Sequence, residues 1–210
     1  MDLYDSSACN LRNSVSDIQK LTHRIKTSAI EYINYGGVFL KNSFANWQIL
    51  GFIFTGISGV ILHFLYELTE QNIFFAPFSA INESIWEHMK ILFFPMFVFS
   101  FIEYRFIGKK HEKFPCYKLA GILIGLLLIP TIYYTYTGVT GLEAGWFNIL
   151  IFYISSAIAY YAETQFFKKN SFPCKRPIVA FIILCLIAVL FIIFTFAQPD
   201  IPLFQDPQQI

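Results

Sequence analysis

Residues 177–199 read PIVAFIILCLIAVLFIIFTFAQP, a run of 23 residues without a charged side chain. A helix rises about 1.5 Å per residue, so about 20 apolar residues cross the roughly 30 Å hydrocarbon core of a bilayer. This run is therefore predicted to be a transmembrane helix. Three other uncharged runs have comparable length and receive the same interpretation: residues 42–66, 119–142 and 144–162.

A fifth span is predicted around the shorter uncharged run of residues 91–102. This run reaches the required length when it is extended upstream through Ile85 and downstream to Tyr104. The sequence thus predicts an all-α, polytopic helical bundle with spans at about residues 47–66, 84–105, 118–138, 145–166 and 177–198. Two tails are predicted outside the spans: residues 1–46, with a short interfacial helix as one interpretation, and residues 199–210.

The composition indicates a membrane protein of one domain. Of the 210 residues, 56% are hydrophobic and 14% are charged, whereas soluble domains carry about 25% charged residues. A soluble globule of this size could not bury so much apolar surface. The net charge of +1, without a basic stripe, argues against a nucleic-acid partner and leaves the lipid bilayer as the expected surroundings.

Basic residues predict the orientation of the spans, because Lys and Arg accumulate in cytoplasmic loops. Alternation of five spans places 14 of the 15 basic residues on one side, and Lys90 is the exception. The N-terminal tail is therefore predicted to be cytoplasmic and the C-terminal tail extracytoplasmic. The expected location is a cell membrane, crossed several times.

The four cysteines follow the same topology. Cys9, Cys116 and Cys174 are predicted to be cytoplasmic, and Cys185 lies within the last span. Because disulfides persist in oxidising compartments, no disulfide is predicted. The sequence contains no CxxC spacing of the kind that forms zinc ribbons.

Ionisable residues within spans are costly and often functional, and two groups of them stand out. His63 and Glu67 lie four residues apart near the outer end of the first span, on one helix face. The second group is the stretch NESIWEHMK, residues 82–90. Because a short connection joins the two groups, they are predicted to face each other in an outer-leaflet pocket. The residues predicted to line it are His63, Glu67, Glu83, Ser84, Glu87, His88 and Lys90.

Three kinds of function fit such a pocket. The leading hypothesis is that it binds, and in a stronger form transports, a small cation or polar solute. A rival is a metal-dependent membrane hydrolase, in which His63, His88 and Glu67 hold a divalent ion such as zinc. Glu87 would then be the general base. The third is a non-catalytic subunit of a membrane complex, or a homo-oligomer packed through glycines.

A structural interpretation stays open beside these. Glu87 and Lys90 are three residues apart and would pair, while His88 would hydrogen-bond a neighbour. Consecutive residues of a helix point about 100° apart, so at most one of Glu87 and His88 is expected to join a site with His63.

Three other acidic residues receive structural interpretations. Glu83 is expected in the first turn of a helix, with Asn82 or Ser79 as its cap. Glu103 is expected to extend to the membrane interface. Glu163 is expected to pair with the lysines of residues 168–169.

The stretch Asn82 to Lys90, followed by Phe93, Phe94 and Pro95, resembles the N-E-S-[IV]-W-E-H-[LM]-K signature of a known family. That family consists of small, uncharacterised bacterial multi-span membrane proteins, and the resemblance covers about residues 47–197. It implies a bacterial inner-membrane location but no particular reaction. It gives weight to a signature site made of Glu83, Ser84, Glu87, His88 and Lys90.

Overall fold

A computed structural model describes residues 44–142, 144–169 and 173–206. The chain divides into two units, residues 1–46 and 47–210. Nearly all of the first unit, with the short helix predicted there, lies outside the described residues, so the described fold is essentially that of the second unit.

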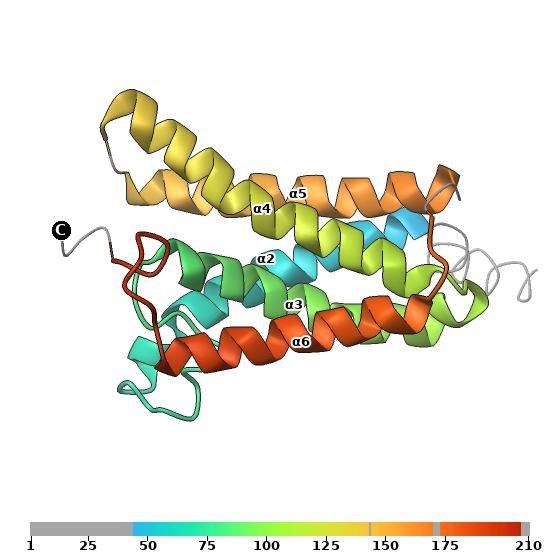
Figure 1. Ribbon diagram of the computed structural model, residues 1–210, viewed down its shortest axis with the longest axis horizontal. Coiled ribbons are helices and arrows are strands. Elements are labelled where there is room, and N and C mark those ends of the chain that lie inside the picture. Colours follow the sequence, from blue (N-terminus) through green and yellow to red (C-terminus); the bar gives the residue numbers. More distant parts are fainter. Residues whose placement is uncertain (1–43, 143, 170–172, 207–210) are drawn as a thin grey trace, which may run out of the picture. The chain divides into compact units, whose positions relative to one another are not determined.

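Five long helices form the described part, with a single 3₁₀ turn η1 (Gly108–Lys110) and no strand within it (Figure 1). The helices are α2 (Phe44–Leu68), α3 (Ile85–Phe106), α4 (Phe114–Thr140), α5 (Gly145–Lys169) and α6 (Pro177–Phe196). Each is long and apolar enough to cross a bilayer. The predicted all-α bundle is confirmed, and the chain is a multi-pass membrane protein.

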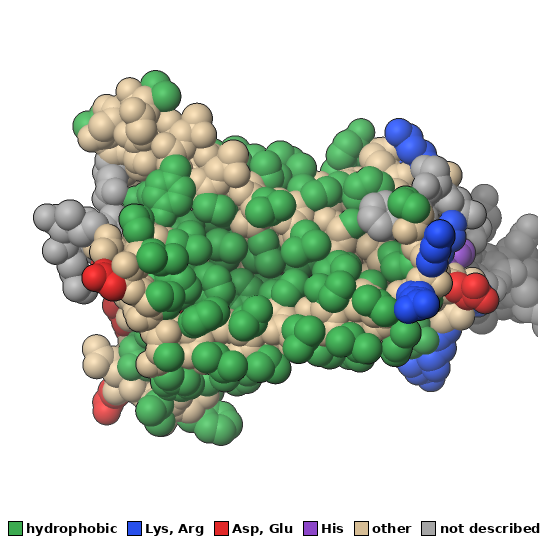
Figure 2. Space-filling view, viewed as in Figure 1, with side chains coloured by type: hydrophobic (Ala, Val, Ile, Leu, Met, Phe, Trp, Pro, Cys, Tyr) green, Lys and Arg blue, Asp and Glu red, His purple; other side chains and the backbone are tan. Residues whose placement is uncertain are grey.

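The two ends of the helices differ in charge. On the face shown in Figure 2, Lys and Arg side chains occur only where α3 and α5 end and α4 and α6 begin. We call this the basic end; its described basic residues are Arg105, Lys109, Lys110, Lys113, Lys168, Lys169, Lys175 and Arg176. The opposite, acidic end carries Glu67, Glu70, Glu83 and Asp200. Which end faces the cytoplasm stays a prediction.

The central helix of the core is α4, which packs most extensively against α5 and also contacts α3 and α6. Gly125 lets α4 approach its neighbours, because a Cβ there would lie 3.0 Å from Leu92 and 3.2 Å from Ala159. From α3, Leu92, Phe93 and Met96 are fully buried. Most side chains of α2 and α6 are not buried, as expected for helices that face lipid.

The helix α3 begins at Ile85. Ser84 is its N-cap and accepts a hydrogen bond from the Glu87 backbone N–H at 3.4 Å. The Asn82 side chain instead accepts from the Ser84 N–H at 3.0 Å. The expectation that Glu83 lies in the first helical turn is therefore wrong, since the cap follows it, and the Glu83 side chain projects from non-helical backbone.

The prediction of no disulfide is also wrong. Cys116 lies in the first turn of α4 and Cys174 lies just before α6, and the two are joined with their Cα atoms 6.2 Å apart. The prediction considered only the redox compartment. Because α4 and α6 are neighbours that both begin at the basic end, their first residues meet.

The residues after α6 turn back onto the start of α3. The Trp86 N–H donates to the Leu203 carbonyl at 3.0 Å, and the Trp86 ring stacks on Phe204 with centroids 4.5 Å apart. The predicted second tail therefore contributes packing at the acidic end.

Candidate functional site

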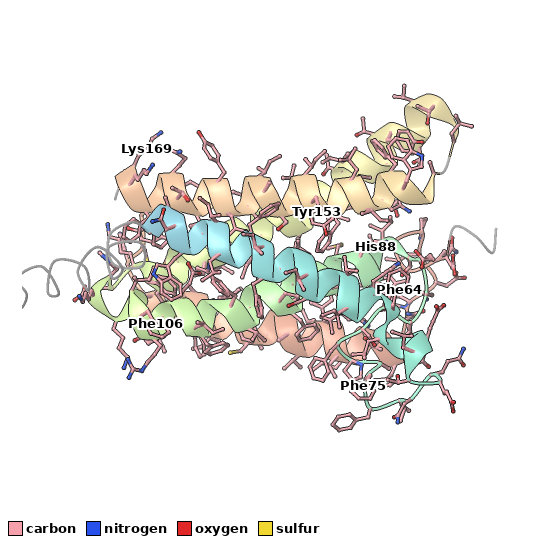
Figure 3. The ribbon with its side chains drawn as sticks, turned by 180° about the vertical axis from the view of Figure 1, so that it is seen from behind. Phe64, Phe75, His88, Phe106, Tyr153 and Lys169 are labelled. Carbon is pink, nitrogen blue, oxygen red and sulfur yellow. A yellow bond between two sulfur atoms is a disulfide. The ribbon has the colours of Figure 1, made fainter. Side chains whose placement is uncertain are left out.

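Three of the predicted pocket residues meet at the acidic end. His63 comes from the last part of α2, Glu83 from the segment before α3, and His88 from the first turn of α3. The Glu83 carboxylate lies between the imidazoles, with Oε1 3.6 Å from His63 Nε2 and Oε2 3.8 Å from His88 Nε2. In Figure 3, His88 lies at the same end as Phe64, far from Phe106 and Lys169 at the basic end.

The backbone carbonyl of Ser84 determines which ring nitrogen of a neutral His88 carries the proton. Its Nδ1 lies 2.9 Å from the backbone carbonyl of Ser84, which can only accept a hydrogen bond. A neutral His88 therefore carries its proton on Nδ1 and directs the Nε2 lone pair towards Glu83. Metal-bound histidines are commonly held in this way by a carbonyl behind the ring.

The helix geometry separates Glu87 from this group, as predicted from the rotation of about 100° between consecutive residues of a helix. The Glu87 carboxylate pairs with Lys90 at 2.5 Å, and both side chains are fully buried. Glu87 Oε2 also accepts from the Ile81 N–H at 3.2 Å. A carboxylate used in this way is poorly suited to act as the general base of a hydrolase.

The other predicted residues have different places. Glu67 is exposed and is not part of the His63–Glu83–His88 group. Ser84 serves as the cap of α3 and as the partner of His88. Lys90 is buried and uses its three N–H donors on Glu87, the Ala76 carbonyl and Thr195.

A small cavity of about 90 Å³ adjoins the two histidines. Its walls include Gly59 of α2 and Phe152 and Tyr153 of α5. Exposure rises from 7% for the His88 side chain through 20% for His63 to 37% for Glu83. The group is therefore reached from the acidic end through Glu83, with its deepest member next to the cavity.

The donor set and its spacing suit a transition metal. Ligand atoms about 2.0–2.1 Å from a tetrahedral zinc ion lie about 3.4 Å from one another. One ligand atom from each of His63, Glu83 and His88 can be chosen so that all lie within 4.8 Å of one another. Small side-chain rotations would bring the three to coordination distance. Two imidazoles and one carboxylate are a common catalytic or exchangeable zinc set, with a fourth position left for water or another ligand.

The sequence profile of a family described as "Family of unknown function (DUF6512)" matches residues 39–209, which include all five described helices, α2 to α6. The chain belongs to DUF6512. No curated protein and no solved structure matches it. The expected membership of an uncharacterised family is thus confirmed, while the signature motif and the bacterial origin stay predictions.

One buried ionic cluster of this DUF6512 member was not predicted from the sequence. Lys118 pairs with both Glu103 and Glu163 in the core near the basic end. Glu103 therefore does not extend to the interface, and Glu163 pairs with Lys118 in place of the lysines of residues 168–169. The sequence did contain a signal for the position of Lys118. Pro115 is typical of a helix N-terminus, and α4 begins at Phe114, so Lys118 lies inside the helix and not in the preceding loop.

Proposed function

We propose that this protein binds a divalent transition-metal ion of the zinc type through His63, Glu83 and His88. The observation that supports it is the convergence of three ligand atoms within 4.8 Å, contributed by α2, α3 and the segment between them. The hydrogen bond from His88 Nδ1 to the Ser84 carbonyl orients one ligand in advance.

The alternatives receive less support. A monovalent cation or a polar solute would not require imidazole nitrogens, which favour transition metals over Na⁺, Mg²⁺ or Ca²⁺. A hydrolase needs a base beside the metal, and Glu87, whose Oε2 contacts Lys90 and the Ile81 N–H, is not part of the group of His63, Glu83 and His88. Transport of the same ion is the stronger form of the proposal, because the group is partly exposed at one end and joined to a cavity.

The first test is the metal content of the detergent-purified protein, measured by elemental mass spectrometry after incubation with zinc and desalting. We expect about one zinc ion per chain in the wild type, because the ligand set is complete. His63→Ala, His88→Ala and Glu83→Gln should each lose nearly all of it, since two ligands hold zinc far less tightly than three.

Two matched controls come from the same chain. His111→Ala removes an exposed histidine at the basic end, and Glu67→Gln removes the exposed acid that the sequence had suggested as a ligand. Both should keep the wild-type zinc content. Absence of zinc in the wild type, or equal loss in His111→Ala and His88→Ala, would contradict metal binding at this site. If zinc binds, its uptake into proteoliposomes, compared between wild type and His88→Ala, tests transport.

A further inference from the structure

A second group of ionisable side chains lies near the basic end and plays no part in the proposed metal site. Glu103 of α3, Lys118 of α4 and Glu163 of α5 are 0%, 1% and 0% exposed. Lys118 Nζ donates to Glu163 Oε2 at 2.5 Å and to Glu103 Oε2. From α2, Gln48 Nε2 donates to Glu103 Oε1 at 2.6 Å. Four helices thus meet at one buried polar cluster.

The charges of this cluster do not balance. Two carboxylates face one ammonium group, so the cluster carries one net negative charge when all three groups are ionised. In the described part of the chain, Lys118 is the only cation within ion-pair distance of either carboxylate. The other close group is Tyr160 of α5, whose ring centroid lies 5.1 Å from Lys118 Nζ and whose hydroxyl hydrogen-bonds Thr55 at 2.8 Å.

An unbalanced charge at this depth is costly, because neither lipid nor apolar side chains replace its hydration. The nearest helix that does not contribute to the cluster, α6, has no charged side chain along its length. One bound proton would make the cluster neutral without any further group.

Two oxygen atoms of the cluster indicate where that proton belongs. Glu163 Oε1 and Gln48 Oε1 are buried and have no hydrogen-bond partner in the described structure. Glu163 Oε1 lies in the space left by Gly121, only 2.5 Å from where a Cβ of that residue would be. An ionised carboxylate oxygen buried without a donor is unfavourable, whereas a protonated carboxyl group removes the charge.

A metal ion fits this cluster less well than a proton. Hard cations take about six or more oxygen ligands, and only two side-chain oxygens of the cluster lack a partner. A proton needs only one carboxylate oxygen, and Glu163 Oε1, which has no partner in the described structure, can supply it.

A cavity of about 510 Å³ connects this region with the basic end. Of the cluster, only Lys118 lines this cavity, together with Ser100 of α3 and with Lys109, His111 and Glu112 in and beside η1. The cavity gives water and protons a route to Lys118 that does not cross the apolar middle of the helices.

We propose that Glu103, Lys118 and Glu163 form a buried proton-binding site, which holds one proton on the carboxylate pair and exchanges it with the basic end through this cavity. The step is a proton transfer: water at the cavity mouth loses or gains the proton, and a carboxylate oxygen gains or loses it. This proposal is independent of metal binding by His63, Glu83 and His88.

Infrared difference spectroscopy of the protein in lipid bilayers tests the proposal, because a protonated carboxylic acid has a carbonyl stretch that a carboxylate lacks. We expect one such band at neutral pH in the wild type. It should disappear in both Glu103→Gln and Glu163→Gln, since each leaves one carboxylate balanced by Lys118. Glu67→Gln, which changes an exposed acid, should keep the band.

The absence of the band in the wild type would overturn the proposal, because both carboxylates would then be ionised. Its persistence in both cluster variants would also overturn it, because another acid would then hold the proton. A rise in melting temperature with sodium chloride over choline chloride, lost in Glu163→Gln, would also overturn it in favour of a sodium site. Circular dichroism and size-exclusion chromatography establish folding of each variant. Since either glutamine variant removes the band, the test survives if one of them fails to fold.

The route is tested by the rate at which the band shifts in D₂O. Ser100→Phe places a ring in the cavity and should slow the shift relative to wild type. An unchanged rate would exclude the cavity as the route of exchange.

Discussion

Lys90 shows what one side chain does in this fold. Its ammonium group contacts Glu87 of α3 at 2.5 Å, the Ala76 carbonyl of the preceding segment at 2.9 Å and Thr195 of α6 at 3.0 Å. A fully buried lysine is tolerated here because all three of its donors have acceptors. By joining three parts of the chain at the acidic end, Lys90 holds the start of α3, which carries His88, in place.

We therefore expect Lys90→Met to destabilise the protein by about 3–5 kcal/mol, because it leaves the Glu87 carboxylate buried without a cation. The measurement is the free energy of unfolding in mixed detergent micelles. The double variant Glu87→Gln, Lys90→Met should recover part of the loss, as expected for a coupled pair.

Lys110→Met is the matched control, since Lys110 is exposed in η1 and should change the free energy of unfolding by less than about 0.5 kcal/mol. Equal effects of Lys90→Met and Lys110→Met would show that the buried pair contributes nothing particular.

At the scale of the elements, glycines determine how closely α2 approaches its neighbours. Gly51, Gly56 and Gly59 recur at near-helical spacing and face aromatic rings of α3 and α5. A Cβ at Gly51 would lie 2.6 Å from Phe99 and 2.7 Å from Tyr160, and both rings are buried. Small residues at such contacts allow van der Waals packing between helices, which drives helix association in lipid.

Gly51→Ala is expected to destabilise the protein. Overpacking a buried contact costs about 1–3 kcal/mol, and two buried rings leave little room, so the loss should exceed the gain of about 1 kcal/mol in helix propensity. Gly138→Ala in α4 is the control, because a Cβ there meets nothing within 4 Å and only the gain applies. Thermal unfolding of both variants checks the difference in sign; a stabilised Gly51→Ala protein would contradict the packing argument.

At the scale of the whole molecule, the charge of the basic end and the disulfide in it point to different compartments. The excess of Lys and Arg there predicts that it faces the cytoplasm. The same end contains the disulfide between Cys116 and Cys174, and disulfides persist in oxidising compartments. The disulfide joins the first turn of α4 to the residues before α6, whichever compartment this end faces.

We expect the charge rule to decide the orientation. In intact cells, a membrane-impermeant maleimide should label Glu67→Cys at the acidic end but label Lys109→Cys only after permeabilisation. Labelling of Lys109→Cys in intact cells, with labelling of Glu67→Cys only after permeabilisation, would reverse the orientation.

Much of the fold was predictable from local sequence. The number of spans and the all-α class follow from the lengths of the uncharged runs, because bilayer thickness sets the length of a helix. The pairing of Glu87 with Lys90 follows from their spacing of three residues. The separation of Glu87 from His88 follows from the rotation of 100° per residue.

The contacts between helices were decided only by the tertiary structure. Glu83 rather than Glu67 lies between the histidines, because α3 starts after Ser84 and leaves Glu83 on non-helical backbone. Lys118 joins Glu103 and Glu163 because three helices turn these faces towards one another. Hydropathy determines how deep a residue lies in the membrane, but the rotation of each helix about its axis depends on packing against all of its neighbours.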